Sequence, residues 1–97
     1  MLENLVCHEL VSHGYTVTIG KNDEREIDFM AEREHNKIYI QVAAHIADRE
    51  TADREFEAFW GIDDNYPKYV LTLDRDFLHN ESGVMAKYLP EFVLSEL

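Results

Sequence analysis

Residues 26–44, EIDFMAEREHNKIYIQVAA, contain two alternating stretches on either side of a polar segment. Both stretches repeat with a period of two and are rich in β-branched and aromatic residues, as strands usually are. The polar residues 33–36 between them have the length and composition of a hairpin loop. The sequence therefore predicts an antiparallel hairpin, and pairing of Glu32 with Lys37 across the loop sets its register.

This register places specific side chains opposite one another. Met30 faces Tyr39, and Asp28 faces Gln41 on the same side of the sheet. A carboxylate beside a carboxamide at mid-strand is unusual, because buried polar groups are costly unless they are paired. This pair, with Ala43 next along the same face, is the first candidate for a functional site.

Length and composition indicate a single domain spanning residues 1–97. Apolar residues make up 45% of the chain, which argues against disorder, and no apolar run approaches the ~20 residues that span a membrane. A signal peptide is not apparent, and the lone Cys7 is interpreted as a buried small hydrophobe in a reducing compartment. We therefore expect a cytoplasmic protein without a membrane partner. The formal net charge of -11 argues against nucleic-acid binding unless metal ions supply positive charge.

The remaining elements follow from periodicity and from capping residues. A helix is predicted over 1–13, ending at Gly14, and a helix over 48–60, starting at Asp48. Strands are predicted over 15–19, 68–73 and, at the sheet edge, 84–89, and a short helix over 90–97, with polar loop over 74–83. The strand, helix and strand between 37 and 73 predict a crossover and a parallel pair. The apolar faces of the two longer helices consist of Leu2, Leu5, Val6 and Leu10, and of Ala52, Phe56, Phe59 and Trp60.

The order of these elements, with four residues on them, resembles the PD-(D/E)XK nuclease superfamily. That superfamily carries a Glu on its first helix, an Asp on its second strand and a polar-x-Lys motif on its third strand. The matching positions are Glu3, Asp28, Gln41 and Ala43. The resemblance implies an α/β fold with an αβββαβ core, in which a mixed central sheet is flanked by helices. From the residues alone, Glu3 is more typical of a solvated acid in a first helical turn than of a site residue.

The chain is more closely similar to the C-terminal domain of unknown function found in many prokaryotic AAA+-type P-loop ATPases. The similarity covers most of residues 2–74, through LENLVCHELVSHGYTVTIG, EIDFMAE, KIYIQVA, DRETADRE and DNYPKYVLTLD. It implies that the chain is an excised C-terminal fragment of a larger ATPase. Because the sequence contains no GxxxxGK[ST] motif, ATP is expected to bind in the missing N-terminal region, and no cofactor is expected in this fragment.

The superfamily resemblance also implies what an active site would require. The strand-two Asp and the strand-three acid bind Mg²⁺, and the Lys helps to activate water or to stabilise developing charge. Here Gln41 offers a neutral oxygen in place of a carboxylate, and Ala43 stands where the Lys would be. The sequence therefore predicts a degenerate nuclease site.

Three functions remain open on this basis. The leading hypothesis is a non-catalytic interaction or regulatory domain, whose partners are the ATPase region in cis, a second copy of the chain, or another protein. The alternative is a divergent Mg²⁺-dependent endonuclease acting on DNA, with Glu3, Asp28 and Gln41 as site residues and Asp28 and Gln41 as metal ligands. The third is an acidic protein-binding or dimerising module unrelated to ATPases.

Other polar groups are interpreted as structural. The five histidines show no zinc-binding spacing. The acids at 53, 55 and 57, beside Arg49 and Arg54, are interpreted as a solvated helix face. Asp74 and Asp76 are expected to fix a local turn. Whether strand 84–89 pairs within the chain or across a dimer is left open.

Overall fold

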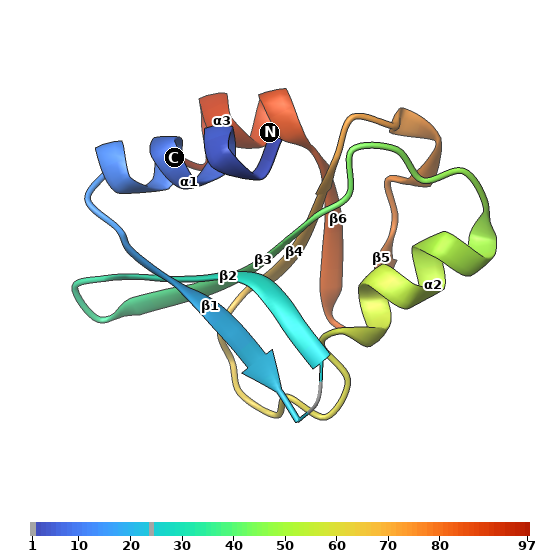
Figure 1. The fold of residues 1–97 in the computed structure, drawn as a ribbon, viewed down its shortest axis with the longest axis horizontal. Helices are drawn as coiled ribbons and strands as arrows, with labels where there is room; N and C mark the ends of the chain where they lie inside the picture. The colour runs from blue at the N-terminus through green and yellow to red at the C-terminus, as the bar shows by residue number, and fades with distance from the viewer. Residues whose placement is uncertain (1, 24) are drawn as a thin grey trace.

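A computed structural model describes residues 2–23 and 25–97, with Phe77 described by its backbone alone. The chain forms a mixed α/β structure in which helices flank a six-stranded sheet (Figure 1). The elements in chain order are α1 (Leu2–Ser12), β1 (Thr16–Asn22), β2 (Arg25–Arg33), β3 (Asn36–Val42), α2 (Arg49–Glu57), β4 (Lys68–Thr72), the 3-10 turn η1 (Arg75–Phe77), β5 (Asn80–Glu81), β6 (Val84–Tyr88) and α3 (Leu89–Ser95).

The sheet has the strand order β1-β2-β3-β4-β6-β5 and is mixed. The meander β1-β2-β3 is antiparallel, whereas β3 and β4 are parallel, as expected for two strands connected through α2. In the predicted hairpin, Glu32 pairs with Lys37 and Met30 with Tyr39, so the predicted register is confirmed. The expectation of a mixed sheet flanked by helices is therefore confirmed.

The prediction for residues 84–89 was wrong in one respect. β6 is not an edge strand: it lies between β4, to which it runs parallel, and the short β5. Val84 and Ala86 on β6 are buried. The edge is formed by β5, within a segment that was expected to be loop. β6 therefore pairs within the chain.

Capping residues lie at the starts and ends of the helices and turns, where their chemistry predicts them. The side chain of Asp48 accepts a hydrogen bond from the Thr51 amide at 2.8 Å and so caps the N-terminus of α2. Gly14 follows α1 with φ +89°, a conformation that favours glycine at a helix end. Asp74 accepts from the Asp76 amide at 3.1 Å, which confirms its expected role in the local turn.

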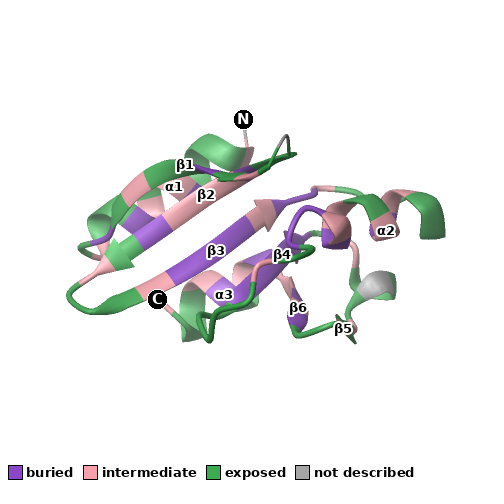
Figure 2. Ribbon diagram, turned by 90° about the horizontal axis from the view of Figure 1, so that it is seen from below, coloured by how far each residue is buried: buried purple, intermediate pink, exposed green. Residues whose placement is uncertain are grey.

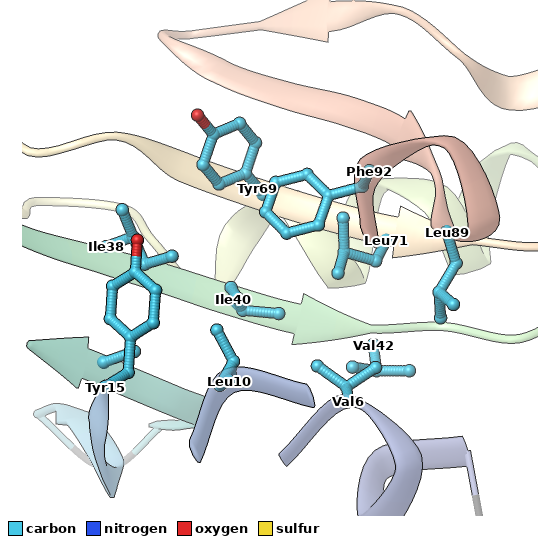
Figure 3. Packing of buried hydrophobic residues seen from close by; sticks show 11 residues of the cluster. Val6, Leu10, Tyr15, Ile38, Ile40, Val42, Tyr69, Leu71, Leu89 and Phe92 are labelled. Carbon is cyan, nitrogen blue, oxygen red and sulfur yellow. The ribbon is translucent and has the colours of Figure 1, made fainter. Parts of the chain in front are cut away.

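Two apolar cores lie on opposite faces of the sheet. In the first, which we call the α1/α3 core, Val6 and Leu10 of α1 and Leu89 and Phe92 of α3 pack against Ile40 and its neighbours on β3 and β4 (Figure 3). In the second, the α2 core, Ala52, Phe56 and Phe59 cover the opposite face. The central strands β3 and β4 are thus largely buried (Figure 2).

Three side chains expected in these cores lie outside them. Leu5 is 49% exposed because it lies on a side of α1 that the sheet does not cover. Trp60 is 53% exposed because α2 ends at Glu57, and its ring lies instead against the Arg25 guanidinium, 5.5 Å away. Cys7 is partly exposed and not buried as expected.

Candidate functional site

Asp28 and Gln41 form a reciprocal brace between β2 and β3. The Gln41 Oε1 atom accepts a hydrogen bond from the Asp28 amide at 2.9 Å. The Asp28 Oδ2 atom accepts one from the Val42 amide at 2.8 Å. The backbone pairing of these strands extends from the hairpin only as far as Phe29 and Ile40. Side-chain oxygens therefore hold the strands together beyond the point where the backbone ladder stops.

The brace lies at the carboxyl end of β3, where the chain leaves the sheet. The two parallel strands β3 and β4 end side by side there, and the Ala43 amide still donates to the Leu71 carbonyl at 2.9 Å. Polar side chains at such an edge are available to a ligand in many open α/β folds. The prediction that positions 28 and 41 lie against each other is confirmed.

Glu55 also belongs to this site, which sequence reasoning missed. It lies on α2 and was interpreted as part of a solvated helix face, but the side chain is half-buried. Its Oε2 atom is buried and has no hydrogen-bond partner among the residues that the structure describes. The position follows Ala52 by three residues and precedes Phe56 by one, so it borders the buried stripe of the helix. That spacing could have identified it.

Burial raises the pKa of both half-buried carboxylates of the site, Asp28 and Glu55. Burial raises the pKa of Asp28, the hydrogen bond from Val42 opposes this, and the charge of Glu3 raises the pKa further. Burial likewise raises the pKa of Glu55, the side-chain amide of Gln41 lowers it, and the charges of Asp28 and Glu3 raise it. Glu3 itself is exposed, as an acid in a first helical turn usually is. Gln41 thus lies beside two carboxyl groups, Asp28 and Glu55, whose pKa values are raised.

Ala43 does not line an open position. The alanine is 8% exposed and belongs to the α2 core with Ile46 and Ala52.

The four lysines of the chain have other contacts or positions. Lys68 Nζ donates hydrogen bonds to three oxygens of Asp64 and Tyr66, and Lys87 Nζ lies 3.9 Å from a Glu96 carboxylate oxygen. Lys37 lies over the rings of Tyr39 and Tyr66, and Lys21 is exposed on the edge strand β1.

The geometry is a poor fit for the Mg²⁺ ion that the nuclease superfamily would place here. One oxygen of Asp28 and the oxygen of Gln41 already accept hydrogen bonds from backbone amides. Across residues 2–23 and 25–97, no cluster of three or more His, Cys, Asp and Glu side chains has an arrangement that could hold a metal ion. Mg²⁺ demands nearly ideal octahedral oxygen ligands. The brace is therefore better suited to joining two strands than to coordinating a cation.

We expect Glu55→Gln to stabilise the domain at pH 7. A carboxyl whose pKa is raised on folding contributes stability below its ordinary pKa, here 4.5, and loses that contribution as the pH rises through the raised value. At pH 7 the charged Glu55 therefore costs free energy, and the neutral amide removes this cost. Solvent screens a half-buried group, so we expect a gain of about 0.5–1 kcal/mol in the free energy of unfolding.

Urea unfolding at several pH values measures this gain. The difference between Glu55→Gln and the unmodified chain should disappear below pH 4.5. Glu50→Gln is the matched control, because Glu50 lies on the same helix with a side chain that is 86% exposed. A Glu55→Gln variant that is less stable than the unmodified chain at pH 7 would show that the charged carboxylate does not destabilise the domain.

The chain shows similarity to a known bacterial protein. The chain is 41% identical over 71 residues to an uncharacterized protein of Haemophilus influenzae. The match covers 73% of this chain but 17% of that protein, so the chain spans less than a fifth of its relative's length. No protein-family model matches the chain. In the described part of the chain, no helix has both the length and the apolar composition needed to cross a membrane.

Proposed function

We propose that this chain is a non-catalytic interaction or regulatory domain with a PD-(D/E)XK nuclease-like fold. We also propose that it forms part of a longer AAA+-type ATPase, in which ATP binds outside the present sequence. One observation carries the first proposal. Ala43, at the position that the superfamily resemblance assigns to the catalytic lysine, is buried in the α2 core. An apolar group in that position can neither activate water nor stabilise developing negative charge.

The brace supports the same proposal. Asp28 and Gln41 match the superfamily's metal ligands by sequence resemblance, but their oxygens accept hydrogen bonds from backbone amides of the facing strand. A buried amide without a partner costs about 1–3 kcal/mol. The two residues therefore have a structural reason to be polar that does not require catalysis.

The size of the relative supports the link to a larger protein. The matched segment is 17% of the H. influenzae protein, so most of that protein lies outside the similarity. A domain of this size attached to a much longer chain is suited to binding or regulating its neighbour. The sequence resemblance to the C-terminal domain of AAA+-type ATPases supports the proposal that the neighbouring region is an ATPase.

A nuclease assay tests the absence of catalysis. We expect no cleavage of supercoiled, linear double-stranded or single-stranded DNA above the level of a buffer blank with Mg²⁺ or Mn²⁺. Asp28→Asn is the matched control, because the asparagine oxygen can still accept the hydrogen bond from Val42. Metal-dependent cleavage by the unmodified chain that Asp28→Asn abolishes would overturn the proposal, because contaminating nucleases would be unaffected by the substitution.

One observation favours the alternative, a divergent Mg²⁺-dependent endonuclease acting on DNA. Glu55 brings a carboxylate to the site that the sequence pattern does not include, and its Oε2 atom has no partner in the described residues. Calorimetric titration with Mg²⁺ or Mn²⁺ distinguishes the two proposals. Heat of binding that disappears in both Asp28→Asn and Glu55→Gln would favour the alternative, whereas no heat of binding would count against it.

A further inference from the structure

An apolar groove runs beside α1 on the face of the sheet opposite α2. Two hollows that share Leu5 form this groove: one of about 320 Å³ lies between α1 and α3, and one of about 550 Å³ lies between α1 and residues Ala44 and Leu73. Both helices pack on the same face through the α1/α3 core, which leaves their outer sides uncovered (Figure 1). We call this surface the α1/α3 groove, and it is lined by Leu2, Leu5, Leu73, Pro90, Val93 and Leu94.

Three of the leucines that line the groove are exposed to solvent. Leu94 is 86% exposed, Leu5 49% and Leu73 38%. Single exposed leucines are common on protein surfaces, but a contiguous set around a hollow typically marks an interaction site. An occupant would therefore present a row of apolar side chains to the groove.

The charges around the groove are acidic. The segments of α1 and α3, LENLVCHELVS and LPEFVLS, contain neither lysine nor arginine. Glu9 lines the hollow from α1, and Glu91 is exposed on α3. The guanidinium of Arg75 lies 3.2 Å from Glu91, but both side chains are more than 60% exposed, and such surface pairs exchange partners at little cost. The two helices that border the smaller hollow thus carry acidic side chains and no lysine or arginine.

We propose that the α1/α3 groove binds a basic amphipathic helix of a partner protein. An apolar stripe on such a helix would fill the groove, and lysines or arginines beside the stripe would face Glu9 and Glu91. Leucines at helical spacing form a row that can enter the two adjoining hollows. The inference rests on the proposed interaction role of the domain and names the kind of partner that this role requires.

A designed peptide pair tests the proposal. The first peptide has about 16 residues, so that it forms a helix longer than α1, with leucines at i, i+3, i+4 and i+7 and lysines on both flanks. The second has the same leucines but glutamates in place of the lysines. Fluorescence anisotropy at low ionic strength should show at least tenfold tighter binding of the lysine peptide, and added salt should reduce that preference.

Two matched variants locate the binding surface. Leu94→Lys should weaken binding of the lysine peptide at least tenfold, whereas Ile19→Lys should change it less than twofold. Ile19 is a suitable control because it is also exposed, at 68%, but lies on β1 outside the groove. Both substitutions add the same charge, and the exposure of both sites allows the variants to fold. Circular dichroism confirms that they do.

Several outcomes would overturn the proposal. These are equal affinity for the two peptides, equal effects of Leu94→Lys and Ile19→Lys, or a dimer in light scattering that Leu94→Lys dissociates, which would make a second copy of the chain the occupant. These results are separable from a failure of the proposed function. DNA cleavage is measured without peptide, and peptide binding is measured without metal, so either proposal can fail while the other holds.

Discussion

Asp64→Ala is expected to lower the free energy of unfolding by about 3 kcal/mol, because it removes the counter-ion of a buried ammonium. The Lys68 side chain is 9% exposed, and its Nζ atom lies 2.8 Å from Asp64 Oδ1. The other oxygen of Asp64 accepts a hydrogen bond from the Tyr39 hydroxyl at 2.7 Å. Loss of the carboxylate leaves both groups without this partner, although the carbonyls of residues 64 and 66 still accept from Lys68.

The pH dependence of this effect follows from the pKa of Asp64. Burial alone would raise that pKa, but the hydrogen bonds from Lys68, Tyr39 and the Tyr66 amide outweigh it and lower the pKa below the ordinary value of 3.8. The contribution of Asp64 is therefore fully present above pH 3.8 and is lost only as the pH falls through the lowered value.

Urea unfolding at pH 7 measures the loss, with Asp63→Ala as the control at an exposed neighbouring acid. Lys68→Met should cost less than Asp64→Ala, because it removes the buried charge together with its need for a partner. If Asp64→Ala stays within about 0.5 kcal/mol of the unmodified chain, as surface substitutions usually do, the ion pair is not a stabilising contact.

Phe92→Ala should destabilise the domain by about 3–5 kcal/mol, the usual cost of removing a buried phenylalanine side chain. Phe92 is 2% exposed and lies edge-on to Tyr69, with ring centroids 4.8 Å apart. It holds α3 against the sheet, so its loss should also disrupt the α1/α3 groove and weaken the binding of the lysine peptide. A domain of this kind has a total stability of about 5–15 kcal/mol, so the loss is a large fraction.

Chemical unfolding measures this change, and Leu94→Ala is the matched control. Leu94 lies two residues further along the same helix but is 86% exposed, so its truncation should change the stability by less than about 0.5 kcal/mol. Equal losses for the two variants would contradict the packing of α3 through Phe92. A stable Phe92→Ala variant with unchanged peptide affinity would contradict the dependence of the groove on this contact.

The sequence was sufficient for features set by local rules. The register of β2 and β3 follows from the two-residue period and the hairpin length, and it placed Asp28 against Gln41. The cap at Asp48 follows from its side-chain chemistry. These features lie within one hairpin or one helical turn, which a single sequence displays directly.

The features that the sequence did not provide depend on what covers a surface. Helical periodicity assigned Leu5 and Trp60 to apolar faces, but it does not show how wide the covering layer is or where the helix ends. Glu55 appeared solvated because the periodicity of α2 does not show that Gln41, on a strand of the central sheet, lies near it. The parallel pairing of β6 with β4 joins segments separated by η1 and β5, whereas β5 pairs with β6 across a tight turn.

The α1/α3 core has a consequence for how the chain is synthesised. Its residues come from the first helix and the last, since Val6 and Leu89 belong to the same cluster. During translation, the meander can emerge and pair while α3 is still inside the ribosome. The core cannot close until nearly the whole segment has been released, so Val6 and its neighbours remain open to chaperones or to wrong contacts during that interval.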